Sequence, residues 1–257
     1  MKNKTIAFAK RNLTEMSRDA LSYIFCVAFP IVMLLIMSVV NSSIPKESGM
    51  TLFRIDNLAG GIAIFGQTFV MLFSALNVTK DRTGSFLIRL FASPMKSRNF
   101  IGGYFLPLII VAIVQVVVSF AAAFAVSLVS GYDLNIGGLL VATVAVIPSA
   151  VMFIAIGMIF GTLFSEKAAP GLCSIVISLG AMVGGIWFDV EGVGGFMEKL
   201  AKCLPFLYAT KLARGAIKTD FEFESFIIPL IVVTCSAAVL TVIACGLFKR
   251  KMRADLS

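Results

Sequence analysis

Six long apolar stretches, separated by shorter polar segments, dominate the pattern of this 257-residue chain. None of them contains Asp, Glu, Lys or Arg, and they cover residues 22–40, 58–78, 101–129, 139–164, 168–188 and 226–248. A helix needs about 20 apolar residues to cross roughly 30 Å of hydrocarbon. The third stretch is longer than a perpendicular crossing requires, so we expect it to tilt or project. The pattern therefore predicts an all-α polytopic membrane protein, with six transmembrane helices in a single transmembrane domain, 1–257.

The segment before the first stretch, 5–21, has an amphipathic pattern. Its apolar positions recur at three- and four-residue steps, as on one face of an α-helix: Ile6, Ala9, Leu13, Met16 and Ala20. Phe8 lies outside this stripe. A helix with a modest apolar stripe and basic flanks is typical of the membrane interface. We expect an N-terminal interfacial amphipathic helix, the alternative being a simple extension of the first span.

The polar segment 79–98, which follows the second span, contains a short apolar helix pattern. Phe86 with Leu90 and Leu87 with Phe91 are i,i+4 pairs, so a helix here would have one apolar face. Such a face could rest on lipid, or it could dock in a groove of a cytoplasmic partner. The pattern alone leaves both interpretations open.

The longest link, 189–225, precedes the last span and holds two further stripes. Phe196, Leu200, Leu204 and Leu207 form the first, which Pro205 interrupts, and Tyr208, Leu212 and Ala216 form the second. Two short amphipathic helices of this kind favour an extracytoplasmic re-entrant or interfacial hairpin, since irregular backbone at membrane depth needs protein or a water-filled cavity around it.

Composition and charge agree with a membrane protein of defined orientation. The chain is 59% hydrophobic and 14% charged, against about 25% charged residues in soluble domains. With a cytoplasmic N-terminus, the inside segments hold fifteen of the 22 Lys and Arg residues but five of the 14 acidic ones. This is the positive-inside pattern, so both termini are expected in the cytoplasm. The net charge of +8 then reflects topology and contact with membrane lipids, not nucleic-acid binding.

Several kinds of chemistry have no candidate residues. There is no histidine, the five cysteines are scattered, and no phosphate-binding G-x-x-x-x-G-K-[ST] run occurs, so we expect no catalytic, metal or cofactor site. Ion-coupled transport normally requires ionisable groups within the spans, which disfavours a secondary transporter. The polar span residues Gln67 and Gln115 are typical of bonds between helices, with ligand contact as the alternative. Five span prolines are expected to kink helices: Pro30, Pro107, Pro148, Pro170 and Pro229.

Four features in this order resemble the type-2 ATP-binding-cassette (ABC) membrane subunits, a family of bacterial six-helix permeases. The first is the amphipathic lead. The second is the run from Lys80 to Leu87, KDRTGSFL, followed by Ser93-Pro94. The others are Gly184-Gly185-Ile186-Trp187-Phe188 at the end of the fifth span, and Leu204-Pro205 with Tyr208 and Arg214 before the sixth. Together they extend over nearly the whole chain.

The resemblance implies an exporter of two membrane subunits, either two copies or a copy and a paralogue, and two cytoplasmic ATPase subunits that bind ATP and Mg. Segment 79–98 would be the coupling helix seated in the ATPase, with the docking residues Asp81, Arg82, Gly84, Phe86, Leu87, Leu90 and Phe91. The lead would be a second contact with the ATPase. The outer hairpin would cap the exit path, with the gate residues Trp187, Phe188, Leu204, Pro205, Tyr208 and Arg214.

The function expected is therefore that of a permease subunit in the bacterial cytoplasmic membrane, exporting an amphipathic or lipid-like antibiotic, drug or peptide. Polysaccharide or lipid-linked glycan export is the alternative, ahead of a secondary transporter or a lipid-modifying enzyme. The first, second and fifth spans are expected near the dimer interface, where substrate could meet Phe65, Gln67, Phe69, Phe73 and Met182. The competing interpretation is that these are ordinary core and lipid-facing residues.

Overall fold

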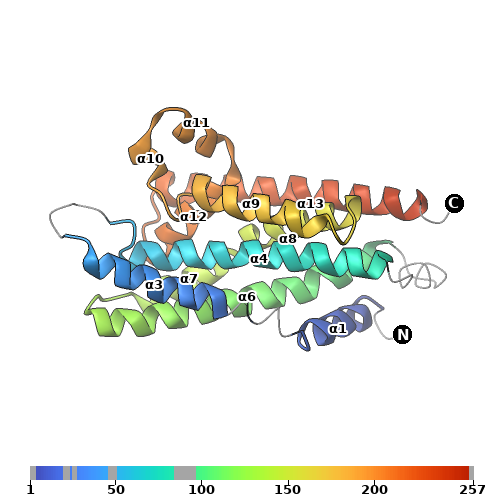
Figure 1. The fold of residues 1–257 in the computed structure, drawn as a ribbon, viewed down its shortest axis with the longest axis horizontal. Coiled ribbons are helices and arrows are strands. Elements are labelled where there is room, and N and C mark those ends of the chain that lie inside the picture. Colours follow the sequence, from blue (N-terminus) through green and yellow to red (C-terminus); the bar gives the residue numbers. More distant parts are fainter. Residues whose placement is uncertain (1–3, 20–23, 25–27, 46–50, 84–96, 255–257) are drawn as a thin grey trace.

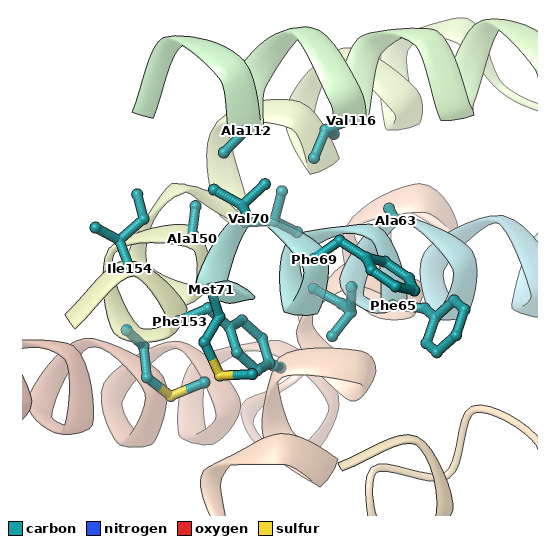
Figure 2. Packing of buried hydrophobic residues seen from close by; sticks show 14 of the residues in the cluster. Ala63, Phe65, Phe69, Val70, Met71, Ala112, Val116, Ala150, Phe153 and Ile154 are labelled. Carbon is teal, nitrogen blue, oxygen red and sulfur yellow. The ribbon is translucent and has the colours of Figure 1, made fainter. Parts of the chain in front are cut away.

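The computed structural model describes residues 4–19, 24, 28–45, 51–83 and 97–254, and every regular element in these ranges is helical. The elements form an elongated bundle (Figure 1). Helix α4 (Ile55–Thr83) lies at its centre and is buried along nearly its whole length. Around it lie α6 (Ser97–Ser130), α8 (Ile147–Leu163), α9 (Ala169–Val183) and α12 (Pro205–Ile217). Figure 2 shows Val70 of α4 between Ala112 and Val116 of α6 and Ala150 of α8.

Small residues allow α4 and α8 to approach closely. A Cβ built on Gly157 would lie 2.2 Å from the carbonyl oxygen of Met71, and one on Gly161 would lie 2.7 Å from that of Ala75. The hydroxyl of Ser74 donates across the same contact to the carbonyl of Ile154 at 2.9 Å. Small residues four apart, with a hydroxyl bond beside them, are a common way for apolar helices to associate where lipid supplies no hydrophobic driving force.

Four helical segments are long and apolar enough to cross a membrane: Ile55–Thr83, Asn99–Ser130, Ile136–Leu163 and Phe223–Lys251. They correspond to the second, third, fourth and sixth predicted spans. The first and fifth correspond to α3 (Phe29–Ser43) and α9, which are apolar but have only 15 residues each. Residues 20–23 and 25–27, at the start of the first predicted span, lie outside the described part. Six crossings therefore stay a prediction.

The fourth predicted span is divided at Val146 into α7 (Ile136–Ala145) and α8. Val146 has φ −87° and ψ 3°, and Pro148 follows in the first turn of α8. The break beside Pro148 agrees with the interruption expected there. Pro30 and Pro170 lie in the first turns of α3 and α9, and Pro170 begins its helix instead of kinking it. Proline lacks an N–H, and the first helical turn does not need one.

Helix α1 (Lys4–Met16) confirms the predicted lead helix, and its buried face shares Ala9 and Met16 with the predicted stripe but is rotated toward Phe8 and Asn12. Its buried residues are Phe8, Ala9, Asn12 and Met16, whereas Ile6 is 58% exposed. The Phe8 ring is the reason, because it fits edge-on against Phe100 and Tyr104 at centroid distances of 5.7 and 5.1 Å, over Gly103. The regular apolar stripe does not include Phe8. The buried face of α1 is determined by its contact with α6 and not by a flat lipid surface, which is why the stripe did not predict it.

The two ends of the bundle differ in character (Figure 1). Helix α1, the C-terminal end of α13 (Ile228–Ala254) and the α8–α9 link lie at one end, which we call the N/C end. At the opposite end lie α10 (Val190–Val193) and α11 (Gly195–Cys203). Helices α11 and α12 meet at Leu204-Pro205, as the two stripes predict, and α12 packs inside the bundle against α4, α7 and α13. Whether this hairpin re-enters a membrane stays a prediction.

Candidate coupling site, pathway and outer site

A buried carboxylate joins three helices at the N/C end. Asp81, in the last turn of α4, is 6% exposed. Its oxygens accept a hydrogen bond from the Tyr104 hydroxyl at 2.7 Å and two from the Arg11 guanidinium at 3.2 and 3.3 Å. We call Arg11, Asp81 and Tyr104 the Asp81 cluster. A buried carboxylate is tolerated when it is paired and hydrogen-bonded in this way.

The surroundings of the Asp81 cluster strengthen the link to α1. Burial alone would lower the pKa of Arg11, but the hydrogen bonds and charges of Asp81 and Glu15 raise it. Next to it, the Asn12 amide donates to the carbonyl of Gly103 on α6 at 3.1 Å. Helix α1 is therefore fixed to α4 and α6 by polar bonds as well as by the Phe8 ring.

The same turn of α4 also contacts the C-terminal end of α8. Arg82 Nη1 donates to the carbonyls of Gly161 and Phe164 at 2.9 and 3.2 Å, where α8 ends. A cation at a helix C-terminus satisfies carbonyls that lack partners within the helix. The Thr83 hydroxyl donates to Glu166 at 2.9 Å. The end of α4 is thus held on both sides, immediately ahead of segment 84–96, which lies outside the described residues.

Aromatic rings gather where α3, α4 and the turn after α9 meet. Phe65 and Phe69 lie edge-on at 5.3 Å between centroids, and Figure 2 shows the two rings side by side. Phe65 is 5.3 Å from the ring of Trp187, and Phe69 is 5.4 Å from that of Phe29. We call these four residues the aromatic cluster. Sequence reasoning included Phe65 and Phe69 in the path and Trp187 in the gate, but it missed Phe29.

Gln67 is completely buried and joins helices. Its Nε2 donates to the carbonyl of Val146 at 3.2 Å, and its Oε1 accepts from the Ser149 hydroxyl at 2.6 Å. The side chain therefore bonds the junction between α7 and α8. Gln115 lies against Gly66, and its Nε2 donates to Ser119 at 3.0 Å, while its Oε1 has no hydrogen-bond partner in the part of the chain that the structure describes.

Arg214 connects α12 to two other elements at the hairpin end of the bundle. Its Nε donates to the carbonyl of Asn57 at 3.0 Å and its Nη2 to that of Gly185 at 2.9 Å. Burial lowers the pKa of Arg214 to about 10, against the opposing charges of Asp56 and Asp189, so it stays cationic at neutral pH. Gly185 has φ +68°, which suits glycine, and this places the turn after α9 within reach of Arg214.

A pocket of about 420 Å³ opens beside Arg214, under the hairpin. Phe188, Leu207 and Lys211 contribute to its walls. The predicted gate residue Tyr208 instead donates its hydroxyl to the carbonyl of Lys202 at 3.2 Å, which braces α12 against α11.

A charged group at the start of α4 was not predicted. Arg54 makes two hydrogen bonds to the carboxylate of Asp56, at 2.8 and 2.7 Å, and Lys218 lies 3.6 Å from the same carboxylate. We call Arg54, Asp56 and Lys218 the outer clamp, because it ties α4 to the end of α12. The sequence did contain a signal for this group, because Arg54 and Asp56 directly precede the second apolar stretch.

In a comparison with known families, residues 3–217 match the ABC-2 type transporter model. The chain belongs to the ABC-2 type transporter family. No curated protein matches it. The matched residues include α1, the Asp81 cluster, the aromatic cluster and both hairpin helices. This ABC-2 protein is therefore a permease component of an ABC transporter, and not its ATPase.

The predicted site residues of this ABC-2 permease fall into three groups. Of the docking set, Asp81 and Arg82 bond within the chain, and Gly84, Phe86, Leu87, Leu90 and Phe91 lie outside the described residues. Of the path set, Phe65 and Phe69 come together, Gln67 and Phe73 are buried between helices, and Met182 is exposed on α9. Of the gate set, Trp187 joins the aromatic cluster, Phe188 and Arg214 line the pocket, and Leu204, Pro205 and Tyr208 shape the hairpin.

Proposed function

We propose that this permease is the membrane subunit of an ATP-driven exporter in the bacterial cytoplasmic membrane, with both termini in the cytoplasm. Two permease subunits would associate with two ATPase subunits, which bind the ATP and Mg. The observation that carries the proposal is the family match over residues 3–217. The N/C end of the bundle would then be cytoplasmic and the hairpin end extracytoplasmic.

The Asp81 cluster supports a coupling role for the segment that follows it. Helix α4 continues through Asp81 to Thr83, so a force on residues 84–91 would act directly on the end of a long buried helix. Arg11 and Tyr104 would pass the same force to α1 and α6 through their hydrogen bonds to Asp81. Nucleotide-driven closure of the ATPase subunits would in this way shift α4 and its neighbours together.

The aromatic cluster supports an amphipathic or lipid-like substrate. Phe29, Phe65, Phe69 and Trp187 present ring faces and edges that suit apolar and cationic groups alike. The cluster lies between α3, α4 and the turn that leads to the hairpin, and Trp187 is followed by Phe188, which lines the outer pocket. A route from the bundle interior to that pocket would pass the cluster. We propose that antibiotic, drug or peptide amphiphiles follow this route.

The docking proposal is tested by co-purification with the cognate ATPase. Leu87→Asp should abolish recovery of the ATPase with the permease, because a charge on the apolar face prevents its burial in a groove. Phe196→Asp is the matched control: it places the same charge on α11 at the opposite end, where Phe196 is 77% exposed, and it should leave assembly intact. Full ATPase recovery with Leu87→Asp would refute the docking role.

The substrate proposal is tested with the reconstituted complex. Amphiphiles should stimulate ATP hydrolysis, and Phe65→Ala should weaken that stimulation by roughly fivefold or more, since it removes the ring that contacts three other aromatic side chains. Stimulation by soluble glycans, without a response to amphiphiles, would contradict the proposed substrate class and favour glycan export.

A further inference from the structure

A second pocket, of about 650 Å³, lies at the hairpin end on the other side of α4. It forms where α3 and α6 end and α4 begins, and Figure 1 shows these three helix ends at the same end of the bundle. Ser38, Asn41, Arg54 and Tyr132 contribute polar atoms to its walls. It is separate from the pocket beside Arg214, with which it shares no lining residue.

The charge of this second pocket is positive. Arg54 is the one charged residue in its wall among the residues that the structure describes. Nε and Nη2 of Arg54 are bound to Asp56, whereas Nη1 makes no hydrogen bond to any described residue. Lys218 also lies at 3.6 Å from Asp56, so the outer clamp as a whole carries one excess positive charge. An anion is therefore the favoured occupant.

Neutral polar side chains line the same pocket as Arg54. The side chains of Asn41 and Ser38 make no hydrogen bond within the described ranges, although both line the pocket. The Tyr132 ring lies 5.4 Å from the Arg54 guanidinium, a cation–π contact that holds its orientation. A guanidinium, an amide and a hydroxyl together match the oxygens of a phosphate group.

Below the pocket, the surface is apolar and open. Val39 of α3 is 66% exposed, and Leu128 and Val129 of α6 are 71% and 90% exposed. Val39 and Val129 also belong to the pocket wall, so the polar pocket continues directly into an apolar face. A cationic polar site thus lies next to exposed aliphatic side chains at the ends of two apolar helices. A phospholipid has the same arrangement, because its charged headgroup adjoins its acyl chains.

We propose that this pocket binds the phosphate of a phospholipid in the outer leaflet, with Arg54, Asn41 and Ser38 as its donors. Val39 and Val129 would contact the first methylenes of the acyl chains. The proposal requires the membrane orientation but not the ATPase, the substrate or the coupling mechanism, so it can fail while the exporter function holds.

The test is native mass spectrometry of the purified full-length protein, with phosphatidylglycerol and the matched diacylglycerol as probes. Wild type should bind phosphatidylglycerol and not diacylglycerol. Arg54→Gln and Asn41→Leu should each weaken binding about tenfold, since each removes a donor to the phosphate. Lys211→Gln is the matched control, because it removes a lysine charge at the same end of the bundle but from the wall of the other pocket, and it should bind nearly as well as wild type.

Asn41→Leu keeps the Arg54–Asp56 pair, so it still decides the question if Arg54→Gln does not fold. Equal affinity of Asn41→Leu and wild type would overturn the proposal. So would diacylglycerol binding as tight as that of phosphatidylglycerol, which would show that the phosphate is not recognised. In a third arm, inorganic phosphate at the lipid's own concentration should not displace the lipid, and displacement would assign the pocket to a soluble anion instead.

Discussion

At the residue scale, glycines determine how closely the two most extensively packed helices approach. The missing side chains of Gly157 and Gly161 leave room for the carbonyls of Met71 and Ala75. Backbone atoms cannot move aside as a flexible side chain can, so these two positions are constrained by the fold. Gly66 differs, because the atoms nearest to it belong to the flexible Gln115 side chain.

Gly157→Ala should therefore destabilise the protein by about 1–3 kcal/mol, the usual cost of overpacking a well-filled interior. The new methyl would lie 2.2 Å from the Met71 oxygen unless α4 and α8 separate. Gly171→Ala on α9 is the control, since a Cβ there meets no atom within 4 Å, and it should be neutral or slightly stabilising. Thermal unfolding of the two purified variants measures the difference. Equal melting temperatures would refute this account of the contact.

Residue-level contacts of this kind could not be predicted from the sequence. Gly157 and Gly161 are two of 21 glycines, and the apolar pattern does not say which of them face another backbone. Gln67 and Arg214 were chosen for their polarity, but their roles as helix ties depend on the carbonyls of Val146, Asn57 and Gly185. Val146 lies at the break between α7 and α8, Gly185 in the turn after α9 and Asn57 in the first turn of α4, and the apolar pattern does not show that these carbonyls face the two side chains.

At the scale of elements, hydropathy predicted the places of the helices well and their bounds less well. The end of α4 continues to Thr83, past the last apolar residue of its stretch, because Asp81 and Arg82 find partners in neighbouring helices. Hydropathy did not mark the break at Val146, since both sides of it are equally apolar, whereas Pro148, two residues later, did indicate a kink. A 3.6-residue stripe could not identify Phe8 either, because its partner surface comes from α6.

Helix α1 offers a direct test at this scale. Phe8→Ala should release α1 from α6, because truncating a buried Phe costs about 3–5 kcal/mol and this ring is the main apolar contact of a terminal helix. Hydrogen–deuterium exchange of residues 4–16 should rise strongly, with a smaller change in the rest of the bundle. Ile6→Ala, at an exposed position of the same helix, should leave exchange unchanged. A larger rise in exchange with Ile6→Ala than with Phe8→Ala would contradict this prediction and would show that the regular stripe is the docking face.

At the scale of the whole molecule, α4 connects the two ends. Its first turn bonds to Arg54, Lys218 and Arg214, and its last turn lies in the Asp81 cluster. Two members of the aromatic cluster, Phe65 and Phe69, lie in the middle of α4. A rigid buried helix with polar ties at both ends would carry a displacement from one side of the membrane to the other without changing its own core contacts.

The Arg11–Asp81 pair tests this transmission in the intact transporter. Arg11→Asp and Asp81→Arg should each leave the ATPase bound but reduce substrate-stimulated hydrolysis by roughly fivefold or more, the range of coupling energies between distant sites. The double swap should restore most of it, since the pair reforms with reversed charges, although Tyr104 loses its carboxylate acceptor. Glu15→Gln is the control, because Glu15 contacts Arg11 at the surface, where ion pairs contribute little. Single variants as active as wild type would show that α1 is a passive attachment, and a double swap no better than the singles would show that geometry, not charge pairing, links α1 to α4.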